Sequence, residues 1–188
     1  MYKICHTEES SRRQRELEQG LLDLMASQAY AKITLTELCR RLQIPRKSFY
    51  RYFPTKDDCL LALIDHTLSD CNDQALKGWT QTGKLDQGVQ LRFFNFWKER
   101  EKLLDAIRDN GLRHLLLDRT TVMIDRMKEN ANSPGFARDQ VEYFIAYGLM
   151  TTVLRWHHFG FPGSAEDLAR VFGSLLGSAD ISIDRLLL

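Results

Sequence analysis

The sequence predicts an all-α protein of about nine helices, and three observations lead to this class. Apolar residues recur at the three- and four-residue spacing of helices along most of the 188 residues, whereas the alternation typical of strands is hard to find. Residue patterns that cap helices precede several of these apolar stretches. Pro and Gly, which number only 4 and 11, mark the breaks between them.

A first helix is expected over about residues 10–30, because Leu17, Leu21 and Leu24 fall on one face. A second begins after Thr34, since Thr34 and Glu37 form the Thr-x-x-Glu pattern in which each side chain satisfies a free backbone donor. Its inner face is apolar, and its outer face is basic. The inner residues are Leu35, Leu38 and Leu42, and the outer ones are Arg40 and Arg41.

A tight turn at Gln43 leads to a short third helix over about residues 45–52. Pro45 suits its first position, and Pro54 forces the chain out of helical geometry. Phe49 and Phe53, four residues apart, are expected to face the core with Ile44.

A fourth helix begins at the candidate N-cap Thr55 and extends at most to Trp79, followed by a loop at 81–84. Five further helices are expected near 85–100, 101–117, 119–130, 138–159 and 165–187. Breaks are expected at 132–135 and 160–163, and Ser164 with Asp167 resembles another N-terminal cap.

The charge divides unevenly along the chain, although the formal net charge is only +1. Residues 1–56 hold eleven Lys and Arg against six Asp and Glu, a net charge of +5, and the remainder carries −4. This asymmetry indicates either a nucleic-acid or membrane contact on the basic part, or a chance cluster on a solvated face. We expect two domains, residues 1–54 and 55–188.

The four cysteines have no zinc-binding spacing and form no Cys-x-x-Cys pair, so we expect reduced thiols. No signal peptide or membrane-spanning run is evident, which favours a cytoplasmic protein without a membrane partner. The adjacent His157 and His158 point apart on a helix and lack a partner ligand, so no metal or other cofactor is expected.

The second and third helices, joined by a tight turn, form a helix-turn-helix unit, in which the later helix enters the major groove of DNA. With Phe49 turned inward, its outer surface is rich in hydrogen-bond donors, which can read base edges and neutralise phosphates. These donors come from Arg46, Lys47, Ser48, Tyr50 and Arg51.

Residues 33–56 resemble the signature of the TetR/AcrR family of transcriptional regulators. The most specific part is Ser-Phe-Tyr-x-Tyr-Phe-x-Thr-Lys at residues 48–56. Two positions depart from the family pattern, which usually has Gly in place of Gln43 and a small residue in place of Lys47. A left-handed residue other than Gly costs roughly 1 kcal/mol, and Lys47 is expected to change which operator is bound.

The resemblance implies a role for each exposed residue. Arg46, Lys47, Ser48 and Tyr50 would contact bases. Thr34, Tyr50, Tyr52 and Lys56 would contact phosphates, with packing against the fourth helix as the alternative for Tyr52. Arg51 is interpreted as a solvated charge.

In this family the C-terminal domain dimerises and binds a small-molecule effector. The last two predicted helices, 138–159 and 165–187, carry more apolar surface than one core needs, which favours a homodimer on a palindromic operator in double-stranded DNA. Effector-binding candidates, whose alternative role is core or interface packing, are Phe93, Trp97, His114, Tyr143, Tyr147 and Trp156.

The sequence therefore predicts a non-enzymatic DNA-binding regulator, a homodimeric repressor released by its effector. Catalytic motifs such as a phosphate-binding Gly-rich loop, G-x-S-x-G or H-E-x-x-H are absent, so no catalytic residue is assigned. Two alternatives remain: a helical adaptor that works through protein contacts, and a transcriptional activator of the same fold without small-ligand control.

Overall fold

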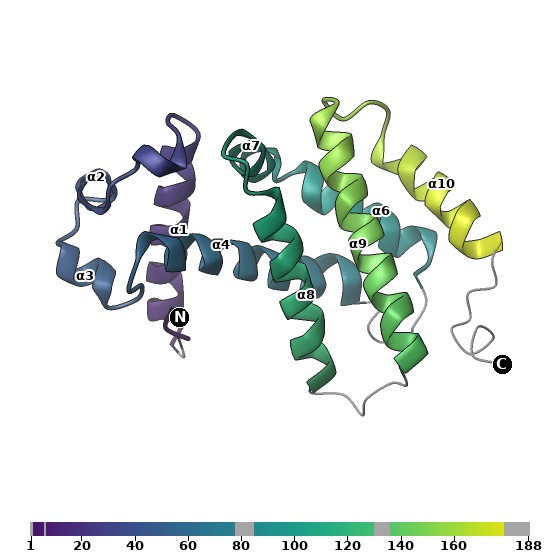
Figure 1. The fold of residues 1–188 in the computed structure, drawn as a ribbon, viewed down its shortest axis with the longest axis horizontal. Helices are drawn as coiled ribbons and strands as arrows, with labels where there is room; N and C mark the ends of the chain where they lie inside the picture. Colours follow the sequence, from purple (N-terminus) through teal and green to yellow (C-terminus); the bar gives the residue numbers. More distant parts are fainter. Residues whose placement is uncertain (1, 6, 78–84, 130–135, 179–188) are drawn as a thin grey trace.

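The computed structural model describes residues 2–5, 7–77, 85–129 and 136–178, and within these ranges the chain is built from helices without strands. Nine α-helices lie in this described part, which confirms the all-α class. Figure 1 shows an elongated arrangement with α1 to α3 at one end, α8 to α10 towards the other, and α4 running between them.

Three helices and a short turn form the N-terminal end. They are α1 (Glu8–Met25), the 3₁₀ turn η1 (Tyr30–Lys32), α2 (Leu35–Arg41) and α3 (Arg46–Tyr50). Most of the inward residues predicted from periodicity are buried, with Leu21, Leu38, Phe49 and Phe53 fully so, whereas Leu35, Leu42 and Ile44 are partly buried against the same core. The first helix ends at Met25, five residues before the predicted position 30, and the Ser27 hydroxyl and amide both donate to the Leu24 carbonyl in the turn that follows.

The turn between α2 and α3 places Gln43 in the left-handed region, with φ of 53°. The amide of Gln43 donates to Arg40 O at 3.2 Å, and that of Ile44 donates to Cys39 O at 3.0 Å. These two hydrogen bonds are the Schellman pattern that normally places Gly at this position. The prediction that Gln43 replaces a left-handed Gly is confirmed. Helix α3 begins at Arg46, one residue later than predicted, with Pro45 as its N-cap.

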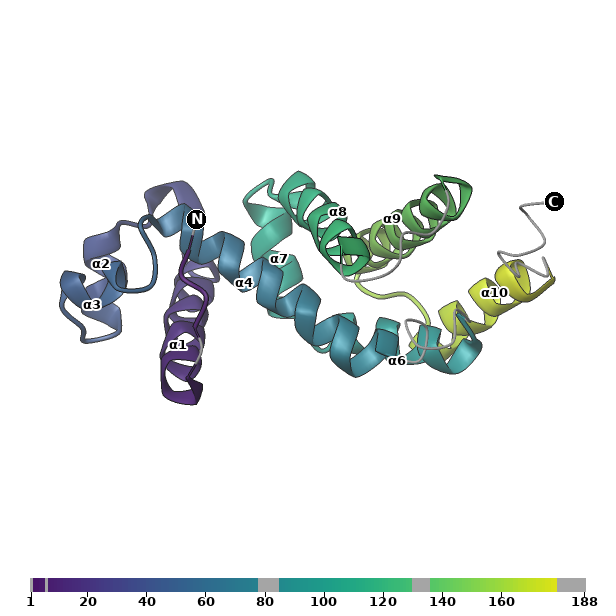
Figure 2. The ribbon, with the colours of Figure 1, turned by 90° about the horizontal axis from the view of Figure 1, so that it is seen from below.

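Helix α4 (Lys56–Cys71) continues into a π-helical segment, η2 (Asn72–Leu76). Its predicted N-cap is confirmed, because Thr55 Oγ1 accepts from the amide of Asp58 at 3.0 Å. Seen from below in Figure 2, α4 leaves the N-terminal helices and continues under α7 and α8. The predicted loop at 81–84 and the helix's expected limit at Trp79 lie outside the described residues.

Polar pairs join α4 to α1. The Glu18 carboxylate is fully buried and lies 2.8 and 3.0 Å from His66 Nδ1, while Arg15 forms a two-pronged ion pair with Asp70 at 2.9 and 3.1 Å. Burial raises the pKa of Glu18, and the hydrogen bond from His66 opposes this shift. A carboxylate without water at this position needs its partner on α4 to stay charged.

The C-terminal part contains α6 (Gln87–Lys98), α7 (Glu101–Asp109), α8 (Arg113–Glu129), α9 (Phe136–His158) and α10 (Ala165–Ser178). The predicted border between the helices 101–117 and 119–130 is wrong, because the chain leaves the helix at Asn110–Leu112 instead. Gly111 has a φ of 68°, and the amides of Gly111 and Leu112 close a second Schellman pattern onto Arg108 and Ile107. The apolar pattern continues across residues 110–112, and for this reason the spacing of apolar residues did not indicate the end of α7.

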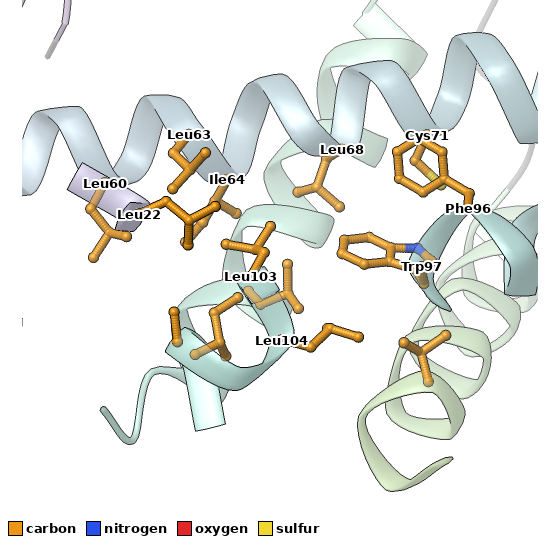
Figure 3. Close-up of a cluster of buried hydrophobic side chains, with 14 of the residues drawn as sticks. Leu22, Leu60, Leu63, Ile64, Leu68, Cys71, Phe96, Trp97, Leu103 and Leu104 are labelled. Atoms are coloured by element: carbon orange, nitrogen blue, oxygen red, sulfur yellow. The ribbon is translucent and has the colours of Figure 1, made fainter. Parts of the chain in front are cut away.

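Figure 3 shows the apolar face of α4 meeting α1, α6 and α7, with Leu60, Ile64 and Leu68 facing Leu103, Leu104 and Trp97. Helix α10 packs along α6 rather than α9, and Phe94 of α6 touches both Trp156 of α9 and Phe172 of α10. The predicted break at 160–163 and the Ser164–Asp167 cap are confirmed, whereas 132–135 lies outside the described residues. Among the helices described, none combines the length and apolar character needed to span a membrane.

Replacing Gln43 with Gly is expected to stabilise the protein by about 1 kcal/mol, because it removes the cost of a left-handed side chain. Chemical denaturation of Gln43→Gly and the unmodified protein measures the change. The control is Ala26→Gly at the end of α1, where φ is −72° and the same residue should cost about 0.5–1 kcal/mol. Equal destabilisation by both variants would contradict the assignment of strain to Gln43.

The raised pKa of Glu18 makes its contribution to stability depend on pH. Because the folded-state pKa lies above the ordinary value of 4.5, this contribution is complete below pH 4.5 and is lost as pH rises through the folded-state pKa. We expect the unfolding free energy of the unmodified protein, relative to Glu18→Gln, to fall as pH is raised above 4.5. The control Glu9→Gln removes an exposed charge from the surface of α1. If the unfolding free energies of Glu18→Gln and the unmodified protein changed in parallel with pH, the expectation would be refuted.

Candidate nucleic-acid interface

Helix α3 has one buried side and one exposed side. Phe49 is fully buried, whereas Arg46, Lys47 and Tyr50 are exposed and Ser48 is half-buried. The Tyr50 ring stands edge-on to that of Phe49, with 55 % of the residue exposed. The aromatic anchor therefore turns the donor-bearing side chains outward, as the sequence predicted for the base-contacting set.

Arg46 extends from the first turn of α3 towards α2. Its guanidinium donates a hydrogen bond to the hydroxyl of Thr36, a residue in the first turn of α2. Burial raises the pKa of the Cys39 thiol, and the charge of Arg46 opposes that shift. Thr36 was not among the predicted site residues, and the contact that reveals it depends on the angle between two helices.

The phosphate-contacting candidates have different surroundings. Thr34 is exposed and its hydroxyl accepts from the amide of Glu37 at 3.2 Å, so it caps α2 as predicted. Tyr52 is half-buried and packs against the core beside Phe53. This position favours the alternative role, packing, over phosphate contact. Tyr50 is exposed.

Lys56 is turned largely inward. Its ammonium donates to the carbonyls of Tyr30 and Ile33, each at 2.8 Å, and lies 4.1 Å from the centroid of the Tyr30 ring. A lysine ammonium has three donors, so one remains beyond these two carbonyls. The sequence pattern predicted that Lys56 lies at the start of a helix, but did not predict its hydrogen bonds to the two carbonyls.

The exposed surface of this unit is basic. Between Thr34 and Lys56 the chain has six Lys and Arg and one acidic residue, Glu37. Arg40, Arg41 and Arg51 are exposed along with the residues of α3. An exposed helical surface of this charge suits the phosphate backbone of a nucleic acid.

The effector-binding candidates fall into separate places. Phe93, Trp97 and Trp156 are buried in the core, and the Trp156 indole donates to the carbonyl of Pro162 at 3.0 Å. Tyr147 exchanges a hydrogen bond with Thr121 at 2.6 Å and Tyr143 donates to Asp125, so both join α9 to α8. His114 is exposed at the start of α8.

The histidine pair behaves as two separate residues. His157 is buried and bonds Asp105 of α7 at 3.0 Å, whereas the exposed His158 lies 3.2 Å from Arg113. Within the ranges that the structure describes, no group of three or more His, Cys, Asp or Glu side chains could hold a metal ion.

Comparison with known proteins supports the helix-turn-helix interpretation. Residues 20–63 match the family model described as bacterial regulatory proteins, tetR family, which confirms the family resemblance of residues 33–56. These residues run from the second half of α1 into α4 and include the whole candidate interface. No curated protein matches the chain.

Two solved structures share the fold. The first is a dihydroxyacetone kinase operon activator, DhaS, with a TM-score of 0.55, 20 % identity, and coverage of 88 % of this chain and 94 % of its own. The second is a tetR-family transcriptional regulator from Streptomyces coelicolor, with a TM-score of 0.51, 20 % identity, and coverage of 88 % and 77 %. At such identity the likeness shows the fold, which continues well beyond residue 63.

The two sides of α3 should respond very differently to truncation. Phe49→Ala empties a fully buried site and is expected to cost about 3–5 kcal/mol of unfolding free energy. Lys47→Ala, on the exposed side, should change stability by no more than about 0.5 kcal/mol. Denaturant titration of both variants checks this, and a large loss at Lys47 would mean that its side chain serves the fold rather than a ligand.

Proposed function

We propose that this chain, whose residues 20–63 match the tetR family model, is a regulator of that family and a homodimeric repressor that leaves its operator when a small molecule binds. The observation that carries the proposal is the exposed donor-rich side of α3, anchored from behind by Phe49 and surrounded by basic residues. The matched family model describes bacterial regulatory proteins, in line with the prediction that the chain is not an enzyme.

For DNA contact we propose the division of roles that the sequence indicated. Arg46, Lys47, Ser48 and Tyr50 read base edges in the major groove. Thr34, Tyr50, Tyr52 and Lys56 hold phosphates, with Lys56 using the donor that its two carbonyl bonds leave over. Arg46 must leave or share its bond to Thr36 in order to reach a base.

The homodimer is proposed to form through α9 and α10. Phe144 on α9 is 75 % exposed, and Thr151 and Arg155 follow it on the same side of that helix. A side chain added at Gly148, which lies between them, would meet nothing within 4 Å, so a second helix can approach closely there. Val171 on α10 is also exposed. A two-fold pair of chains would present two α3 helices to half-sites about one helical turn apart.

The effector site is proposed in the C-terminal part among Phe93, Trp97, His114, Tyr143, Tyr147 and Trp156. The polar groups that suit this role best are Tyr143 and Tyr147, which lie half-buried between α8 and α9. The buried position of Phe93, Trp97 and Trp156 favours a structural role for these three in the core.

An activator is the second candidate, because one structure of this fold is named an operon activator. A reporter gene placed downstream of the bound operator separates the two roles. Repression predicts lower output when the chain is present, and activation predicts higher output. An adaptor that works through protein contacts predicts no discrimination between operator and scrambled DNA.

Binding selection from random duplexes is expected to return a palindrome. Arg46→Ala should relax the preference at one position in each half-site, at a cost of roughly 1–3 kcal/mol, because a base contact is lost. Arg92→Ala removes an exposed arginine from α6, outside the proposed DNA and dimer surfaces, and serves as the matched control. Recovery of no enriched sequence by the unmodified protein would overturn the proposed function.

A further inference from the structure

The turn η1 is held by a residue from the C-terminal part of the chain. The amide of Tyr30 donates to Asn110 Oδ1 at 2.5 Å, and Asn110 Nδ2 donates in turn to the carbonyl of Ala106 at 2.8 Å. The carboxamide of Asn110 therefore bridges the last turn of α7 and the turn that precedes α2. No sequence pattern connects these positions, which are 80 residues apart.

The corner that carries Asn110 has a defined geometry. Asn110 caps α7, and the left-handed Gly111 with the two Schellman hydrogen bonds fixes the direction in which α8 leaves. Helix α8 in turn reaches α4 through Arg119, which forms a two-pronged ion pair with Asp65 at 2.6 Å. Movement of α7 or α8 must therefore move the carboxamide that holds Tyr30.

The other polar groups of Tyr30 bind the start of α4. Its carbonyl accepts from Lys56 at 2.8 Å, and its hydroxyl donates to the carboxylate of Asp57. Burial and the neighbouring Asp57 raise the pKa of the Tyr30 hydroxyl, so it stays a donor at physiological pH. Tyr30 therefore hydrogen-bonds to Asn110 at the α7–α8 corner through its amide, and to the start of α4 through its carbonyl and its hydroxyl.

The same lysine extends the connection to α2. Lys56 also donates to the carbonyl of Ile33, which directly precedes the N-cap Thr34. The first turn of α2 contains Thr36, which holds Arg46 of α3. Hydrogen bonds therefore run from Asn110 through Tyr30 and Lys56 to Ile33, and the backbone from Ile33 to Thr36 completes the connection to Arg46.

We propose that Tyr30 is the junction through which the C-terminal helices set the position of α2 and α3 for DNA, with Asn110 and Lys56 as positioning residues. The inference rests on the proposed DNA-binding function and adds its route of control. Joints between parts that move relative to each other are typically polar. Lys102 of α7 also forms an ion pair with Asp23 of α1 at 2.5 Å, which is a further polar contact between these parts.

Hydrogen exchange measured by mass spectrometry, with and without the operator duplex returned by selection, tests this coupling. In the unmodified protein the duplex should slow exchange in α2 and α3 and also at the α7–α8 corner, by at least about fivefold, because coupling between two sites is reciprocal. In Asn110→Ala the duplex should still protect α2 and α3, but protection of the corner should be lost. Asn95→Ala, the same change on α6, should retain it.

Each result has one meaning. Retained protection of the corner in Asn110→Ala, or protection confined to α2 and α3 in the unmodified protein, would overturn the junction. The second of these measurements needs no variant, so it remains decisive if Asn110→Ala does not fold. Failure of the duplex to protect α2 and α3 in the unmodified protein would instead refute the proposed DNA binding.

Discussion

The packing of α4 against α1 is the contact on which the rest of the structure depends. Helix α4 is the only element described here that closes the N-terminal helices at one end and contributes its apolar face to the C-terminal core at the other. The buried Glu18 makes this contact specific, because its carboxylate finds a partner only when His66 is opposite it. A slip of α4 along α1 would leave that charge without water or a hydrogen bond, which is costly.

The packing of α1 against α4 also determines the orientation of α3 and therefore the candidate interface. Phe49 and Phe53 are drawn into the core that α1 and α4 complete, and a five-residue helix has little freedom once its aromatic side is fixed. The remaining side chains of α3 then point outward together. Their chemistry is suited to DNA because charge and donors are concentrated there, whereas the buried residue of the same short helix is Phe49.

The two parts of the chain differ in how closely they follow known proteins. The family model matches residues 20–63, where a tight turn, two caps and an aromatic anchor leave few alternatives at each position. The C-terminal helices share their arrangement with solved structures at only 20 % identity. Apolar residues of similar size can replace each other in a helical core, so the fold persists there while the sequence changes.

The sequence alone was enough to predict the class, the helix-turn-helix, the exposed set on α3 and the left-handed Gln43, because these depend on spacing and capping between near neighbours. The end of α1, the break at Asn110–Leu112 and the packing of α10 on α6 were not predicted. Each depends on competition between a continuing apolar pattern and a local stop or a distant partner. The inward position of Lys56, the Arg46–Thr36 bond and the Asn110–Tyr30 bond were decided only by the tertiary structure, since residues far apart in the chain meet only after the helices pack.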